Sequence, residues 1–157
     1  MKEKDNGTKL LLRFAIGPLI DGVCGSKSFS EKAQKYLKGD DSLELEIKIE
    51  IPNQLKTAWP FLLHIAQKNK SEALAYSTVY TYIFYMHNKM VPPACAVKSG
   101  IVKKINVGEE NDIAFVETED GLEGKVNFLN SDRNKIQKGE KIFFHHNWFV
   151  EVSVPSK

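Results

Sequence analysis

Residues 92–152, PPACAVKSGIVKKINVGEENDIAFVETEDGLEGKVNFLNSDRNKIQKGEKIFFHHNWFVEV, decide the fold of this chain. Short apolar runs recur along the stretch, and polar turns, most of them containing glycine, separate them. Runs of this length and spacing are typical of a small β-barrel, which hides its strand edges by closing on itself. The stretch begins near Cys95 and returns to His145 and His146, so a thiol and two imidazoles lie at its two ends.

The apolar runs predict five strands, which cover residues 96–105, 113–118, 123–129, 141–144 and 148–152. Gly100 predicts a kink or bulge within the first of them. Asp120-Gly121 is a turn signal between the second and the third. The fold expected for residues 92–157 is therefore a small antiparallel β-barrel of the OB-like kind.

The first 91 residues predict a separate, mainly helical domain. Apolar residues at helical spacing and good helix formers indicate helices over residues 9–16, 28–38, 55–67 and 72–88. Gly17 and Pro18 are expected to stop the first helix. Pro92 and Pro93 predict a stiff linker. The fold class is α+β, with a helical N-terminal body over residues 1–91 and the barrel over residues 92–157.

Residues 43–51, LELEIKIEI, alternate strictly between apolar and charged side chains. This period is typical of a half-buried strand, and three isoleucines favour the same interpretation. Glutamate and leucine also form helices, so a helix is the alternative. We expect a strand that ends at Pro52.

The composition excludes several classes of protein. Hydrophobic residues at 42% and charged residues at 27% exclude a disordered chain. A net charge of +2 gives no sign of the clustered basic face that nucleic acid requires. Two cysteines do not form a disulfide framework, so we expect reduced thiols inside the cell. No apolar run reaches the roughly 18 residues of a membrane span, and no secretory signal is visible. A cytoplasmic protein without a membrane partner is expected.

Cysteine and histidine carry the candidate chemistry. A thiolate and a neutral imidazole are good ligands for Fe(II) and other late metals. Cys95, His145 and His146 are therefore candidate metal ligands, and Cys24, in a glycine-flanked loop, could supply an additional one. Two protein ligands suit a carrier that releases its cargo. The alternative is that the cysteines are small packed residues and the histidines ordinary turn residues.

An enzyme is not indicated, and we assign no catalytic residue and no required cofactor. The chain contains no glycine-rich phosphate loop, no H-E-x-x-H motif and no G-x-S-x-G motif. A nucleic-acid-binding barrel is one alternative, with Phe128, Phe143 and Trp148 as stacking platforms, although acidic residues among the lysines disfavour it. A protein-interaction scaffold is another, with Trp148 and Phe149 facing a protein partner.

Residues 95–105, CAVKSGIVKKI, resemble the opening of hydrogenase assembly chaperones of the HypC/HupF type, which begin with a cysteine, an apolar pair, a glycine and a valine-rich strand. Residues 136–142, IQKGEKI, are similar to their V-x-x-G-D-x-V turn, and residues 144–150, FHHNWFV, to their V-H-A-G-F-A-I segment. The resemblance implies that Cys95 takes the place of the iron-binding cysteine and His145 that of its partner histidine. Iron is the metal that it implies. In those chaperones the cysteine becomes the amino terminus, whereas Cys95 is internal.

The front of the chain resembles an uncharacterised prokaryotic family found alongside nickel-iron hydrogenase genes. The resemblance rests on RFA at residues 13–15, GVCG at residues 22–25 and AWPFL at residues 58–62. Together the two resemblances imply a non-enzymatic accessory protein, linked to nickel-iron hydrogenase maturation. The implied partner is a maturation factor or the hydrogenase large subunit.

Overall fold

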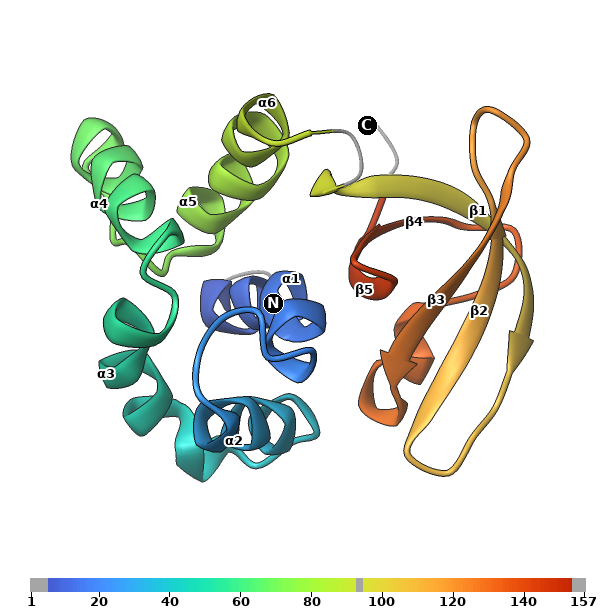
Figure 1. Ribbon diagram of the computed structural model, residues 1–157, viewed down its shortest axis with the longest axis horizontal. Coiled ribbons are helices and arrows are strands. Elements are labelled where there is room, and N and C mark those ends of the chain that lie inside the picture. The colour runs from blue at the N-terminus through green and yellow to red at the C-terminus, as the bar shows by residue number, and fades with distance from the viewer. Residues whose placement is uncertain (1–5, 93–94, 154–157) are drawn as a thin grey trace.

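The computed structural model describes residues 6–92 and 95–153 and places a helical body beside a closed β-barrel (Figure 1). The helices are α1 (Gly7–Ile20), α2 (Lys27–Leu37), α3 (Glu44–Gln54), α4 (Ala58–Asn69), α5 (Tyr76–Thr81) and α6 (Asn88–Met90), with a 3-10 turn η2 (Asp41–Leu43) and a π-helical segment η3 (Tyr82–His87). The strands are β1 (Lys98–Asn106), β2 (Asn111–Glu117), β3 (Glu123–Leu129), β4 (Lys141–His145) and β5 (Trp148–Val152), with a 3-10 turn η5 (Asn130–Lys135) after β3. The predicted α+β class and the five strands are confirmed.

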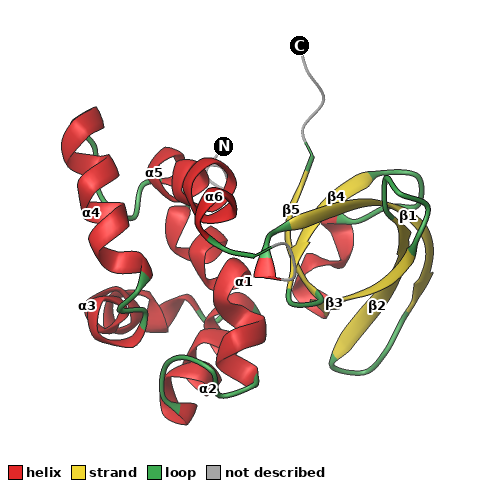
Figure 2. Ribbon diagram, turned by 45° about the horizontal axis from the view of Figure 1, so that its top comes forward, coloured by secondary structure: helices red, strands yellow, loops and turns green. Residues whose placement is uncertain are grey.

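The barrel closes in the order β1-β2-β3-β5-β4, and β4 returns to β1 (Figure 2). Four of the pairings are antiparallel, but β3 and β5 run parallel where Asn127 meets Trp148. The barrel is therefore mixed, with one parallel pairing between two strands that are distant in sequence. Gly100 is needed where β1 approaches β2, since a Cβ there would lie 3.0 Å from the side chain of Val116. The register shift of β1 follows it, between Val102 and Lys104.

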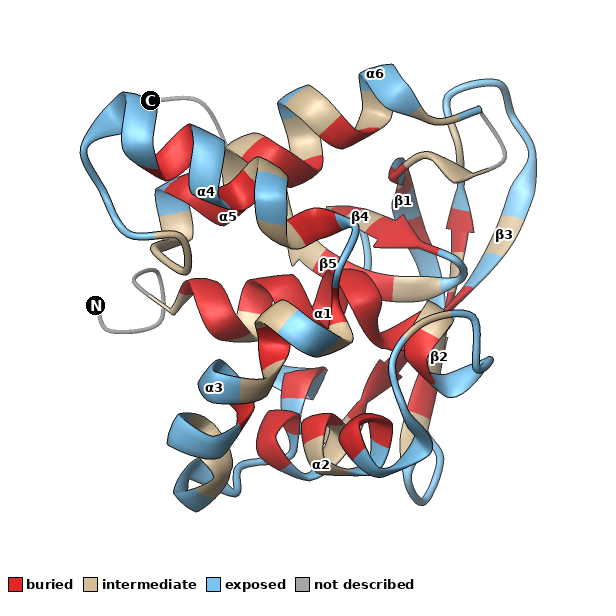
Figure 3. Cartoon of the chain, turned by 60° about the vertical axis from the view of Figure 1, so that its left-hand side comes forward, coloured by how far each residue is buried: buried red, intermediate tan, exposed pale blue. Residues whose placement is uncertain are grey.

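Helix α1 is the centre of the molecule. Eleven of its fourteen residues are buried, so nearly every side of the helix faces other parts of the molecule. Figure 3 shows this burial along the helix. It packs against α2, α5 and β5, with the helical body on one side and the barrel on the other (Figure 1). Val97, Leu129 and Val150 accordingly belong to the same apolar cluster as the helices. The two parts share a core, and the predicted division at residue 91 stays a prediction.

The expected stop at Gly17 and Pro18 is wrong, because α1 continues to Ile20. A Cβ at Gly17 would lie 2.9 Å from the Cβ of His146. Glycine therefore lets α1 touch the β4–β5 hairpin at this point. Pro18 lies in the last turn of the helix. A histidine of the barrel, His145, supplies the hydrogen bond that the proline cannot donate.

The strand expected over residues 43–51 is also wrong, because Glu44 to Gln54 form α3. In a helix, residues four apart share a face, so Ile47 and Ile51 are fully buried. Ile49 lies on the opposite face and is 68% exposed. A salt bridge of 2.9 Å between Glu44 and Lys48 has the same i,i+4 spacing. The alternating sequence is compatible with the two-residue period of a strand and also places Ile47 and Ile51 one helical turn apart. The helix forms because these two isoleucines pack into the core of the helical body.

The helix expected from residue 72 begins instead at Tyr76. The hydroxyl of Ser71 shares a hydrogen bond of 2.8 Å with the hydroxyl of Thr78 in this helix. Among the described residues, no helix has both the length and the apolar character needed to cross a membrane.

The two faces of α3 give a direct test of its helical structure. Ile47→Ala is expected to lower the free energy of unfolding by about 2–5 kcal/mol, because it leaves a cavity in the core. Ile49→Ala, the matched control on the exposed face, should change it by no more than about 0.5 kcal/mol. Urea denaturation measures both. Equal losses would mean that the two isoleucines share one buried face, as they would in a strand.

Candidate functional site

A histidine of the barrel replaces a missing backbone hydrogen bond of α1. Pro18 has no amide hydrogen, so the carbonyl of Phe14, four residues earlier, lacks its helical donor. Nδ1 of His145 lies 2.7 Å from this carbonyl oxygen. Because a carbonyl can only accept, Nδ1 must carry the proton. The two rings also stack, with their centroids 4.2 Å apart.

This contact leaves the other nitrogen of His145 without a partner. The residue is 3% exposed, and its Nε2 is one of the two buried side-chain atoms without a hydrogen bond in the described part of the chain. Burial lowers the pKa of His145 to about 4, although the carbonyls of Phe14 and Cys95 oppose the shift. The ring is therefore neutral near pH 7 and presents a lone pair at Nε2. A buried acceptor of this kind is costly unless something binds it.

Both cysteines and three histidines line one cavity of about 620 Å³, which lies between α1, the start of α4, the end of η3 and the β4–β5 hairpin. The thiols and imidazoles among the lining residues are those of Cys24, His87, Cys95, His145 and His146. The predicted ligands thus come from distant parts of the sequence to one place. All three stretches quoted for the front-part resemblance also reach this cavity, through Phe14, Cys24 and Ala58 among others.

Cys95 is held beside the barrel by Asn88. The side chain of Asn88 accepts a hydrogen bond of 2.8 Å from the amide of Val97 and donates one of 3.1 Å to the carbonyl of the same residue. These two bonds imitate a strand partner and fix the chain just after Cys95. The π-helical turns of η3 end at His87, which places Asn88 at this position and His87 against Phe14, with 4.8 Å between the ring centroids.

Cys24 lies in the predicted loop, which also lines the cavity. The carbonyl of Pro18 accepts hydrogen bonds from the amides of Val23 at 2.9 Å and Cys24 at 3.4 Å, so the loop folds back onto the end of α1. Gly22 and Gly25 have φ values of +76° and +70°, which favour glycine. Burial raises the pKa of the Cys24 thiol, so this side chain stays protonated near neutral pH.

Arg13 provides a second polar connection between α1 and the barrel. Its Nε donates to the carbonyl of Val150 at 2.6 Å, and its guanidinium lies 3.3 Å from the carboxylate of Glu151. The hydroxyl of Tyr76 donates to the same carboxylate at 2.7 Å. Buried charges are stable only when paired in this way. Residues 13–15 thus connect to β5 through Arg13 and to β4 through Phe14.

The aromatic residues expected at the surface are partly inside. Phe149 is 2% exposed and Phe128 is 1% exposed, both in the barrel core. Neither offers a face for stacking or for a partner. Trp148 is half-buried, and a Cβ on Gly17 would lie 3.2 Å from its ring. Phe143 packs against Phe84, with 4.8 Å between the ring centroids. A partner-binding role for Trp148 stays a prediction.

Sequence reasoning missed His87 and the function of Pro18. Nothing in the local sequence pattern indicates the π-helical segment that positions His87. For the contact of Pro18, the only signal in the sequence was a proline close to the end of a strongly apolar run. His146 is exposed at the hairpin turn, where it and Asn147 have φ values of +51° and +66°. Two successive positive φ values are typical of a two-residue hairpin loop.

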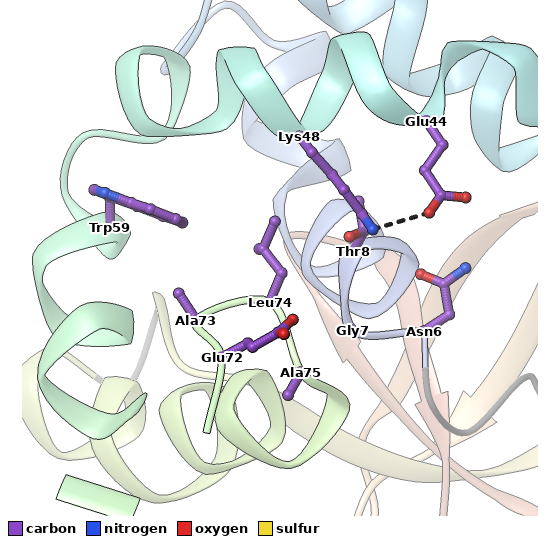
Figure 4. A pocket seen from close by; sticks show the side chains of 10 residues that line it. All are labelled: Asn6, Gly7, Thr8, Glu44, Lys48, Trp59, Glu72, Ala73, Leu74 and Ala75. Carbon is purple, nitrogen blue, oxygen red and sulfur yellow. Dashed lines mark ion pairs between the residues drawn. The ribbon is translucent and has the colours of Figure 1, made fainter. Parts of the chain in front are cut away.

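A second cavity, of about 530 Å³, lies at the start of α1 (Figure 4). Its lining includes the ion pair of Glu44 and Lys48, the indole of Trp59 and the side chain of Glu72. None of the predicted site residues lines it. The thiols and imidazoles therefore single out the cavity beside His145 as the candidate site.

The candidate site is not a closed metal centre. Within the described ranges, no group of three histidine, cysteine, aspartate or glutamate side chains is arranged to hold a metal ion. The described residues therefore do not supply a full set of protein ligands for a resident metal. A neutral imidazole with a free Nε2 and a thiol on the same cavity wall can instead supply one or two ligands to a cargo that brings its other ligands with it.

Comparison with known proteins adds nothing to this geometry: no protein-family model matches the chain, and neither a curated protein nor a solved structure matches it.

The lowered pKa of His145 predicts a pH-dependent stability. The folded-state pKa of about 4 lies below the ordinary value of 6.5, so between these values the unfolded chain binds more protons. The stabilisation that comes from the neutral ring of His145 is therefore fully present above pH 6.5. Up to roughly 3 kcal/mol of the free energy of unfolding is lost as the pH falls towards 4. The lowered pKa of His87 acts in the same direction.

Urea denaturation between pH 4 and 7 should show a clearly smaller slope of stability against pH in His145→Asn than in the wild type. The asparagine amide can still donate to the Phe14 carbonyl, so the comparison isolates the titrating group. His64→Asn, which changes an exposed histidine of α4, is the control and should keep the wild-type slope. An unchanged slope in His145→Asn would contradict the burial argument.

Proposed function

We propose that this protein is a non-enzymatic accessory protein that carries a metal cargo, bound in the cavity between α1 and the β4–β5 hairpin. The observation that carries the proposal is the buried, unpartnered Nε2 of His145 in a cavity that Cys95 also lines. Burial makes this nitrogen a ready ligand at neutral pH, because no proton has to leave before a metal binds.

The site suits transient binding better than permanent binding. Two protein ligands leave most coordination positions of a transition metal to other groups, so a partner can take the metal over. The cavity is much larger than a bare ion, which leaves room for ligands that arrive with the metal. The helical body contributes Cys24 and His87 as further candidate ligands, and the ring centroid of His87 lies 5.2 Å from that of His145.

The resemblance to hydrogenase assembly chaperones supports iron as the cargo and nickel-iron hydrogenase maturation as the context. The matching positions, Cys95 and His145, are brought to the same cavity. A cytoplasmic location and a partner among the maturation factors or the hydrogenase large subunit belong to the same proposal. Because Cys95 is internal, transfer would occur from within the cavity and not from a mobile chain end.

Metal binding without oxygen tests the proposal. The reduced protein should bind Fe(II), and Co(II) should give the charge-transfer absorption of a thiolate ligand. Cys95→Ala should abolish that absorption, and both Cys95→Ala and His145→Asn should weaken binding at least tenfold. His64→Asn, which changes a histidine that does not line the cavity, should bind as the wild type does. Equal binding in all four proteins, or none in the wild type, would contradict the proposal.

A further inference from the structure

The same cavity has features that a metal ion does not require. Its volume of about 620 Å³ lies within the range of roughly 300–1,000 Å³ of small-molecule sites. Much of its wall is apolar, with Leu11, Ala15, Leu55, Ala58 and Val91 around the rings of Phe14 and Tyr82. A wall of this kind gains free energy from covering an apolar molecule.

The charge of the lining restricts what can bind. Apart from the histidines, the only basic side chain among the described lining residues is that of Lys56, which is exposed. No carboxylate is found among the described residues that line the cavity. A charged ligand would lose its hydration without finding a buried counter-charge, which is costly. The walls therefore favour a neutral molecule.

The hydrogen-bond pattern restricts the ligand further. Oε1 of Gln54 already accepts from the amide of Ser26 at 2.7 Å, and Nδ1 of His87 pairs with Asn88 at 3.3 Å. The Phe14 carbonyl holds the proton of His145 on Nδ1, so Nε2 can only accept. An occupant that donates a hydrogen bond satisfies this atom, and one that only accepts does not.

We propose that the cavity binds a neutral, largely apolar organic molecule with one hydroxyl or N–H group, which donates to Nε2 of His145. This inference shares its cavity with the proposed metal cargo but does not depend on it. It uses the imidazole as an acceptor and the apolar wall as the recognition surface, whereas metal binding also needs the thiolate of Cys95.

Four probes that share the naphthalene ring system test this inference: 2-naphthol, naphthalene, 2-methoxynaphthalene and 2-naphthoate. Calorimetric titration of the wild-type protein should show 2-naphthol binding about tenfold more tightly than naphthalene or the methyl ether, since both leave Nε2 without a donor. The carboxylate should bind more weakly than 2-naphthol. In His145→Asn the preference for 2-naphthol over naphthalene should disappear.

Cys95→Ala separates this inference from the metal proposal, because it should keep the preference for 2-naphthol while losing the metal. Equal affinity of the wild type for 2-naphthol and naphthalene would overturn the inference, as would the absence of binding by any probe. A preference that persists in His145→Asn would also overturn it. The comparison of probes on the unmodified protein needs no variant, so a folding defect cannot obscure the result.

Discussion

The hydrogen bond from Nδ1 of His145 to the carbonyl of Phe14 is the contact on which the rest of the site depends. It exists because Pro18 has no amide hydrogen to give to that carbonyl. A buried carbonyl without a donor is costly, and here a side chain of the barrel supplies the donor. The contact therefore stabilises the last turn of α1, sets the tautomer of a histidine and joins the barrel to the helical body.

Several neighbouring features serve the same junction. Gly17 allows the hairpin to approach, Arg13 reaches β5, and the rings of Phe14 and His145 stack between them. Because Nδ1 is occupied, the reactive side of the imidazole faces the cavity and not the helix. The junction is thus both the structural connection of the two parts and the origin of the candidate chemistry. A cavity at such an interface is a common place for a binding site.

The sequence predicted the barrel well, because its short strands alternate with clear turn signals and each strand buries one face. It failed where two periods fit the same residues. Residues 43–51 alternate like a strand, yet Ile47 and Ile51 are also one helical turn apart, and only the packing around them distinguishes the two. Pro18 was expected to end a helix, because the donor that compensates for it lies 127 positions later in the sequence.

The candidate site could be predicted only in part. Its members Cys24, Cys95, His145 and His146 stood out by residue type, and the structure places all four on one cavity. His87 could not be foreseen, since its position depends on the π-helical segment that it ends. The same holds for the unpartnered Nε2, because it follows from a tertiary contact and not from any local pattern.

The most direct test of the account is the protonation state of His145, measured by ¹⁵N–¹H correlation NMR of the imidazole at pH 7. The account predicts a proton on Nδ1 and the chemical shift of an unprotonated nitrogen at Nε2, with this state retained on acidification until the pH nears 4. A proton on Nε2, or a charged ring at pH 7, would contradict it, because Nε2 would then have no lone pair to offer to a metal or to a hydrogen-bond donor.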